Sequence, residues 1–139
     1  MTRQVRIRWV LAASAIVVTT SLMWLDSAIS WWSNILSLFL RVNEDATTSV
    51  MNHRQNGDAD LHALLWGITA LFVLFACTSR SLRWRATVVL GVWSVFVEIS
   101  QPWFTELRSR QASDLIGNAI GLIGAFVIFE AILYRKSHN

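Results

Sequence analysis

The sequence is poor in charge, in cysteine and in proline, and each scarcity narrows the class of protein. Only 15% of its 139 residues are charged, against about a quarter in soluble domains, while 54% are hydrophobic and the mean hydropathy is +0.45. The single cysteine, Cys77, excludes an intramolecular disulfide framework. CxxC, HExxH, phosphate-loop and GxSxG patterns are absent, which excludes the common catalytic signatures. The composition predicts a membrane protein without room for a separate soluble domain.

Four apolar stretches approach the length of about 20 residues that crosses a bilayer as a helix. They are residues 9–25, 61–78, 86–101 and 114–134. The first follows arginines, as the apolar part of a signal peptide does. It is long for that role and no small-x-small cleavage site follows, so we interpret it as a retained helix. The third is followed by the single proline, Pro102, and should end or bend near Gln101.

A weaker apolar stretch, residues 27–40, lies between the first two spans. It is short for a span, and its adjacent Trp31 and Trp32 favour the headgroup level of a bilayer. We expect an interfacial helix there, the alternatives being a continuation of the first helix or a re-entrant turn. Residues 41–60 and 79–85 are expected to be loops. The predicted fold is an all-α membrane protein, a four-transmembrane-helix bundle with an additional interfacial helix between the first and second spans, in one domain over residues 1–139.

The basic residues predict the orientation of this bundle. Most fall on one side of a four-span arrangement: Arg3, Arg6, Arg8, Arg80, Arg83, Arg85, Arg135 and Lys136. The other side receives Arg41, Arg54, Arg108 and Arg110. Because cytoplasmic loops are enriched in Lys and Arg, both termini are expected in the cytoplasm. The arginines flank apolar runs and do not gather on one polar face, so nucleic acid is not an expected partner.

Polar residues that are costly in a bilayer stand at the outer ends of the third and fourth spans, where they suggest a site. Glu98 and Gln101 are three residues apart and therefore share a helix face. Asp114 and Asn118 lie one above the other in the first turns of the fourth span, and Ser113 is the expected N-cap.

The second span and the last hairpin add candidates at the same depth. His62 heads the second span one turn after Asp58, although Asp58 could serve only the helix dipole. Arg110 and Arg108 lie on the side where arginines are disfavoured, which suggests that they bind an anionic headgroup or pair with Glu98 and Asp114. A solvated loop charge is the plainer interpretation, more so for Arg108.

Other polar and small residues have plainer interpretations. Gly117, Gly121 and Gly124 are expected to allow close helix packing. Glu130 is expected to extend toward Arg135 or Lys136 at the cytoplasmic end of the last span.

This arrangement resembles the VanZ-like family of small bacterial membrane proteins. The family pattern is Asp-Lys-x-x-His starting one span, Glu-x-x-Gln ending the next, and Arg-x-x-x-Asp-x-x-x-Asn-x-x-Gly opening the last. The chain resembles it over residues 56–130, through Asp58, His62, Glu98, Gln101, Arg110, Asp114, Asn118 and Gly121. Ala59 and Trp66 stand where the family has lysine and tyrosine. The resemblance implies a protein of the bacterial cytoplasmic membrane with a cell-envelope role, one member being associated with resistance to the glycopeptide teicoplanin.

These residues suit proton transfer, divalent metal binding or phosphate capture, and their spacing does not choose among the three. We expect an outward-facing pocket that recognises an anionic lipid or a lipid-linked glycan, with Arg110, Asp58, Gln101 and Asn118 binding the ligand. The first alternative is an enzyme acting on a lipid-linked phosphate or glycosyl group, with His62, Glu98 and Asp114 as catalytic residues. The second is a structural scaffold without a ligand. The lipid bilayer is the expected surrounding, and the sequence predicts no particular metal, cofactor or oligomeric state.

Overall fold

The computed structural model describes residues 2–40, 58–105 and 111–138, with their side chains except those of residues 29, 33 and 36–40. All elements within these ranges are helical. They are α1 (Arg3–Met23), α2 (Ser27–Leu40), α4 (Ala59–Ala76), α5 (Arg80–Ser100), the short 3₁₀ helix η2 (Gln101–Trp103) and α6 (Ala112–His138). The predicted all-α class is confirmed. The loop predicted at residues 41–60 lies outside the described residues up to residue 57, and its last two residues belong to α4.

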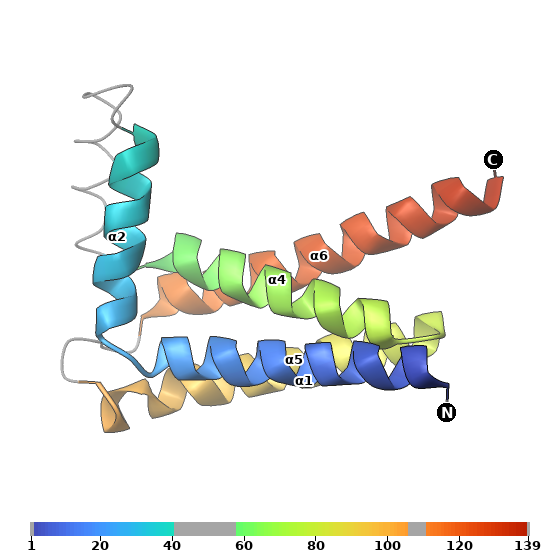
Figure 1. Cartoon of the computed structure of the whole chain (residues 1–139). Coiled ribbons are helices and arrows are strands. Elements are labelled where there is room, and N and C mark those ends of the chain that lie inside the picture. The colour runs from blue at the N-terminus through green and yellow to red at the C-terminus, as the bar shows by residue number, and fades with distance from the viewer. Residues whose placement is uncertain (1, 41–57, 106–110, 139) are drawn as a thin grey trace.

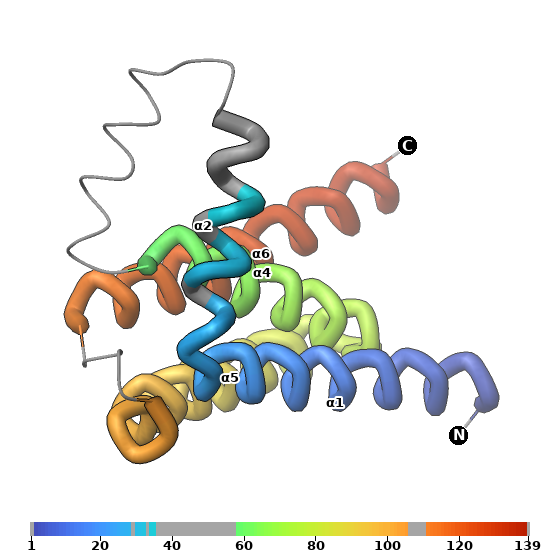
Figure 2. Tube along the Cα trace, turned by 60° about the vertical axis from the view of Figure 1, so that its left-hand side comes forward, coloured from blue at the N-terminus to red at the C-terminus, as the bar shows by residue number. Residues whose placement is uncertain are grey.

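Four long helices run back and forth beside one another, and α2 crosses one end of this bundle (Figure 1, Figure 2). The central helix is α4, which contacts α1, α5 and α6. Both termini lie at the end away from α2 (Figure 1). Helices α4 and α6 therefore begin at the end of the bundle that α2 crosses. Helix α5 runs the other way and terminates there.

Three of the helices, α1, α4 and α6, are long and apolar enough to cross a membrane. α5 has 21 residues, but it carries Arg80, Arg83 and Arg85 in its first two turns and Glu98 in its last. Its bounds include the predicted third span except Gln101, which begins η2, and α2 has the bounds predicted for the interfacial helix. Whether α5 crosses the membrane and α2 lies on its surface stays a prediction.

The outer surface and the interior of the bundle have the polarity expected of a protein in lipid. Large apolar side chains cover the outside, with Val92 68% and Ile120 62% exposed. Inside, the hydroxyl groups of Thr19 in α1 and Thr69 in α4 are 2.8 Å apart and buried. Hydrogen bonds between buried polar side chains join helices in membranes, where burial of apolar surface supplies no attraction between helices.

The interface between α4 and α6 depends on glycine. A Cβ atom on Gly117 would overlap the carbonyl oxygen of Ala59, and one on Gly121 would overlap that of Ala63. The packing role predicted for these two glycines is therefore confirmed. A Cβ atom on Gly124 would meet no other atom within 4 Å, so the same prediction is wrong for Gly124.

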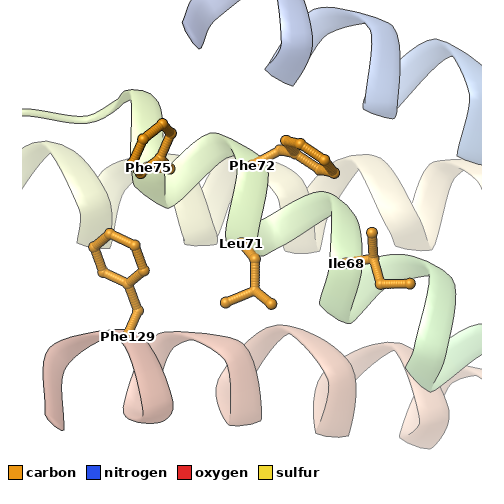
Figure 3. Close-up of a pocket in the computed structure, with 5 residues that line it drawn as sticks. All are labelled: Ile68, Leu71, Phe72, Phe75 and Phe129. Atoms are coloured by element: carbon orange, nitrogen blue, oxygen red, sulfur yellow. The ribbon is translucent and has the colours of Figure 1, made fainter. Parts of the chain in front are cut away.

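Toward the end with the termini, α4 and α6 separate (Figure 1). An apolar cleft of about 340 Å³ lies between them there, lined by Ile68, Leu71, Phe72, Phe75 and Phe129 (Figure 3). Since its walls are almost entirely apolar, the cleft is suited to hydrocarbon and not to a polar substrate.

The prediction of a loop at residues 79–85 is wrong for all but Ser79, because α5 begins at Arg80. Ser79 caps the helix: its hydroxyl oxygen accepts a hydrogen bond from the backbone nitrogen of Leu82, at 3.2 Å. A serine directly before the first arginine was a start signal that the sequence interpretation did not use.

Starting α5 early places Arg83 inside the bundle. Its guanidinium group donates to the carboxylate of Glu130 in α6, and Arg80 lies 3.6 Å from the other oxygen of that carboxylate. The expected extension of Glu130 toward Arg135 or Lys136 is therefore replaced by an ion pair between α5 and α6. An arginine that pairs across helices avoids the cost of an isolated buried charge.

Candidate functional site

The predicted polar residues from three helices meet at the end of the bundle that α2 crosses. His62 lies in the first turn of α4 with its side chain 1% exposed, and Glu98, in the last turn of α5, is 2% exposed. Asp114 and Asn118, in the first two turns of α6, are buried as well. Residues more than fifty positions apart in the sequence therefore form one buried cluster.

The imidazole of His62 is the centre of this cluster. Its Nδ1 atom lies 2.9 Å from the side-chain oxygen of Asn118 and 3.8 Å from Oε2 of Glu98. An amide oxygen only accepts hydrogen bonds, so Nδ1 is the donor in the short contact. A neutral ring with its hydrogen on Nδ1 has a lone pair on Nε2.

The other ring nitrogen of His62 faces two carboxyl groups. Nε2 lies 3.5 Å from Oδ1 of Asp58 and 3.9 Å from Oδ2 of Asp114. Asp58 occupies the N-cap position of α4, yet its side chain makes no capping hydrogen bond there. The carboxyl group of Asp58 is thus close to His62 and does not cap α4, while the helix-dipole role considered from the sequence stays a prediction.

Several buried polar atoms of this region have no hydrogen-bond partner among the described residues. They are His62 Nε2, Trp66 Nε1, Glu98 Oε2, Gln101 Nε2 and Asn118 Nδ2. Buried polar groups in proteins are nearly always paired, and each unpaired one costs on the order of 1–3 kcal/mol. Such a concentration at one place is the mark of a site that binds something further.

The second oxygen of Glu98 has a structural contact. Oε1 accepts a hydrogen bond from the backbone nitrogen of Gln111, at 3.2 Å, which joins the end of α5 to the residue just before α6. Ser113 is not the N-cap, because α6 already begins at Ala112. Its hydroxyl group instead donates to Oδ1 of Asp114, at 3.2 Å.

Two of the predicted ligand-binding residues, Gln101 and Arg110, are not among the described contacts of His62. Gln101 is buried in η2, where α5 ends ahead of Pro102 as the sequence predicted. Arg110 and its neighbour Arg108 lie outside the described residues. The described part of the cluster therefore contains the carboxyl groups of Asp58, Glu98 and Asp114 beside one imidazole.

The arrangement also has the composition of a cation site. One ligand atom each from Asp58, His62 and Asp114 can be chosen so that all three lie within 4.8 Å of one another. Imidazole and carboxylate are common ligands of divalent transition metals.

Sequence reasoning missed the tryptophans that support the site. Trp66 is fully buried one turn after His62 in α4. The indole nitrogen of Trp24 donates to the hydroxyl group of Ser100 at 3.1 Å, which fixes the end of α1 against the end of α5. Indole groups near the ends of spans were interpreted as interface anchors, although the same residues can also donate hydrogen bonds inside a bundle.

A polar cluster in a helical membrane protein does not identify a family by its geometry alone. Comparisons of the chain with protein-family models, with curated proteins and with solved structures gave no match.

Proposed function

We propose that the protein binds the polar headgroup of an anionic lipid or lipid-linked glycan at the cluster around His62, on the outer face of the bacterial cytoplasmic membrane. In this proposal α5 crosses the membrane as the third of four spans, and α2 lies at the membrane surface. The motif resemblance to VanZ-like proteins supports a cell-envelope role, and through it a link to glycopeptide resistance.

The proposed orientation follows from the basic residues and the arrangement of the helices. The two termini lie at the same end of the bundle (Figure 1), and α5 begins at that end with its arginines. The last turn of α6 adds Arg135 and Lys136 there. Because positive charge favours the cytoplasmic side, the cluster around His62 would face outward.

The observation that carries the proposal is the set of buried polar atoms that have no hydrogen-bond partner among the described residues. A scaffold whose polar residues only lock helix ends would pair them with one another. Here Gln101 Nε2, Asn118 Nδ2 and Glu98 Oε2 have no partner among the described residues, so donors and an acceptor are available to a ligand. A headgroup rich in hydroxyl or phosphate oxygens would accept from the two amide groups.

An apolar groove beside the cluster supports a lipid as the ligand. It has a volume of about 210 Å³, and it lies between α1, α2 and α4. Its walls include Trp31, Trp32 and Leu61, and Leu61 directly precedes His62. An acyl chain in this groove would leave its headgroup near the polar atoms of the cluster.

Replacing Gln101 by leucine tests the proposal against a scaffold role. Gln101 Nε2 is buried and unpaired, so the exchange removes an unsatisfied donor and should leave the free energy of unfolding unchanged or raised. Lipids retained after purification from membranes in mild detergent would be identified by mass spectrometry. We expect Gln101→Leu to retain less anionic lipid than the parent, at equal retention of phosphatidylcholine. Unchanged lipid retention together with a large loss of stability would support the scaffold instead.

A second candidate function is catalysis on a lipid-linked phosphate or glycosyl group. It is favoured by one observation: Oε2 of Glu98 is buried without a partner and lies 3.8 Å from Nδ1 of His62. A carboxyl group and an imidazole at this distance can act together as acid and base. A purified assay of headgroup release should then lose turnover in both His62→Ala and Glu98→Gln. Release that neither exchange alters would rule catalysis out.

A further inference from the structure

We propose that Asp58, His62 and Asp114 bind one divalent transition-metal ion of the Mn²⁺ or Zn²⁺ class. The inference rests on the proposed function only in using the same cluster, and it adds the group that would let an acidic site attract an anionic headgroup. It is argued from the distances, the burial and the hydrogen bond of one histidine.

The three side chains already have nearly the spacing that an ion requires. Ligand atoms about 2.1 Å from a tetrahedral ion are roughly 3.4 Å apart. Nε2 of His62 lies 3.5 Å from Oδ1 of Asp58 and 3.9 Å from Oδ2 of Asp114. All three ligand atoms lie within 4.8 Å of one another, so rotation of the two carboxyl side chains would bring them to the spacing around one ion.

The same distances do not suit direct hydrogen bonds. A hydrogen bond between a charged imidazole and a carboxylate has a length of about 2.7–2.9 Å. Both contacts of Nε2 are longer, and this atom has no hydrogen-bond partner among the described residues although His62 is 1% exposed. A buried ring nitrogen that lies between two carboxyl groups, at distances longer than hydrogen bonds, leaves space for a cation bound by all three side chains.

The opposite side of the ring is arranged as it is in metal-binding histidines. Such residues usually donate their second ring N–H to an oxygen, which fixes the tautomer and the ring orientation. Asn118 provides that oxygen, 2.9 Å from Nδ1 of His62. The Nε2 lone pair is then directed at the space that Asp58 and Asp114 share.

The ligand types indicate the class of ion. One imidazole and two carboxylates suit Zn²⁺ or Mn²⁺, whereas Ca²⁺ and Mg²⁺ prefer oxygen ligands alone. Three protein ligands would leave a coordination position for a phosphate or hydroxyl oxygen of the headgroup.

The test is metal binding by the full chain in detergent after chelator treatment, without added lipid. Mn²⁺ would be titrated and its free fraction measured by electron paramagnetic resonance, with Zn²⁺ as competitor. We expect one saturable site per chain. Asp114→Asn and His62→Asn should each raise the dissociation constant at least tenfold. Asp60→Asn, beside the cluster, and His138→Asn, in the last turn of α6, are the matched controls and should bind as the parent does.

Circular dichroism and gel filtration of each variant would show whether it is folded, and Asp58→Asn serves as a second ligand variant. No saturable site in the parent, or a site that survives the ligand exchanges, would overturn the inference. If the parent retains anionic lipid yet binds no metal, the metal site is wrong and the proposed function stands. If it binds one ion and no anionic lipid, the proposed function fails and the metal site stands.

Discussion

His62 and Asn118 are joined across α4 and α6 by a contact of 2.9 Å between Nδ1 and the amide oxygen. The contact is short because the two helices approach closely at Gly117 and Gly121, where a methyl group would overlap the backbone of α4. Gly117 directly precedes Asn118, and Gly121 follows it by one turn. The packing glycines and the polar cluster are therefore parts of one arrangement. The close approach of α4 and α6 at the glycines brings Asn118 to His62, and the contact orients the imidazole ring.

Asn118 should determine the metal affinity of the cluster without being a ligand. Asn118→Leu removes the acceptor of the Nδ1 hydrogen, so the ring loses its fixed tautomer, and the dissociation constant for Mn²⁺ should rise about 10- to 100-fold. Asn118→Asp keeps an acceptor and should bind at least as tightly as the parent. Equal affinities in the leucine and aspartate variants would contradict an orienting role.

Substitution of Gly121 should destabilise the protein, and the same change at Gly124 should not. Gly121→Ala forces a Cβ atom onto the carbonyl oxygen of Ala63, so α4 and α6 must move apart, at a cost of about 1–3 kcal/mol. Gly124→Ala places its Cβ atom in open space, and the free energy of unfolding should stay within about 0.5 kcal/mol of the parent. Unfolding in a mixed-detergent titration measures both. A similar loss in the two variants would show that contact with α4 does not set the effect, because alanine has the higher helix propensity and would not by itself cause a loss.

The ion pair between Arg83 and Glu130 should contribute more than the one that Arg80 makes with the same carboxylate. The side chain of Arg83 is 11% exposed and that of Arg80 is 80% exposed. Arg83→Met leaves the partly buried Glu130 without its near partner, which should cost about 1–3 kcal/mol after allowance for the exposure of Glu130. Arg80→Met should cost under about 1 kcal/mol.

A double-mutant cycle with Glu130→Gln separates this coupling from lost packing. The coupling energy of Arg83 with Glu130, from unfolding in detergent, should exceed that of Arg80 with Glu130. A coupling near zero for Arg83 would show that its stem, which also lies over the ring of Phe129, supplies the stability.

Helix positions and the members of the cluster could be predicted from the sequence because both follow from simple physical preferences. Apolar length located α1, α4 and α6, and the bounds of α2 were predicted to the residue. His62, Glu98 and Asp114 stood out because charged or polar groups at the ends of apolar runs are expensive unless they meet. Their coming together needs only that successive spans run in opposite directions.

Pairings between distant residues could not be predicted in this way. Arg83 was interpreted as a flanking charge, and its pairing with Glu130 depends on the rotation of α5 about its own axis. The difference between Gly121 and Gly124 likewise depends on which face of α6 meets α4. Hydropathy fixes the length and depth of a span and carries little information about its rotation.

Arg110 should select anionic headgroups, because its positive charge attracts them in the proposed recognition. It stands four residues before Asp114 in the chain, and the proposed orientation assigns it to the outer side, where arginines are disfavoured. Its planar guanidinium group suits phosphate or carboxylate oxygens. In nanodiscs of mixed phosphatidylglycerol and phosphatidylcholine, Arg110→Ala should reduce the anionic lipid that stays bound after exchange into detergent, while unfolding is unchanged.

Arg110→Lys separates charge from geometry in the same experiment, since lysine keeps the charge without the paired donors. It should retain an intermediate amount of phosphatidylglycerol. Arg108→Ala, two residues earlier, is the matched control and should have the smaller effect, because it removes the same charge at a position six residues before Asp114 in the chain. If Arg108→Ala and Arg110→Ala lower the bound fraction equally, the hairpin attracts lipid through net charge alone. If neither changes it, the headgroup is held without these arginines, and the amide groups of Gln101 and Asn118 with a bound cation would have to account for recognition.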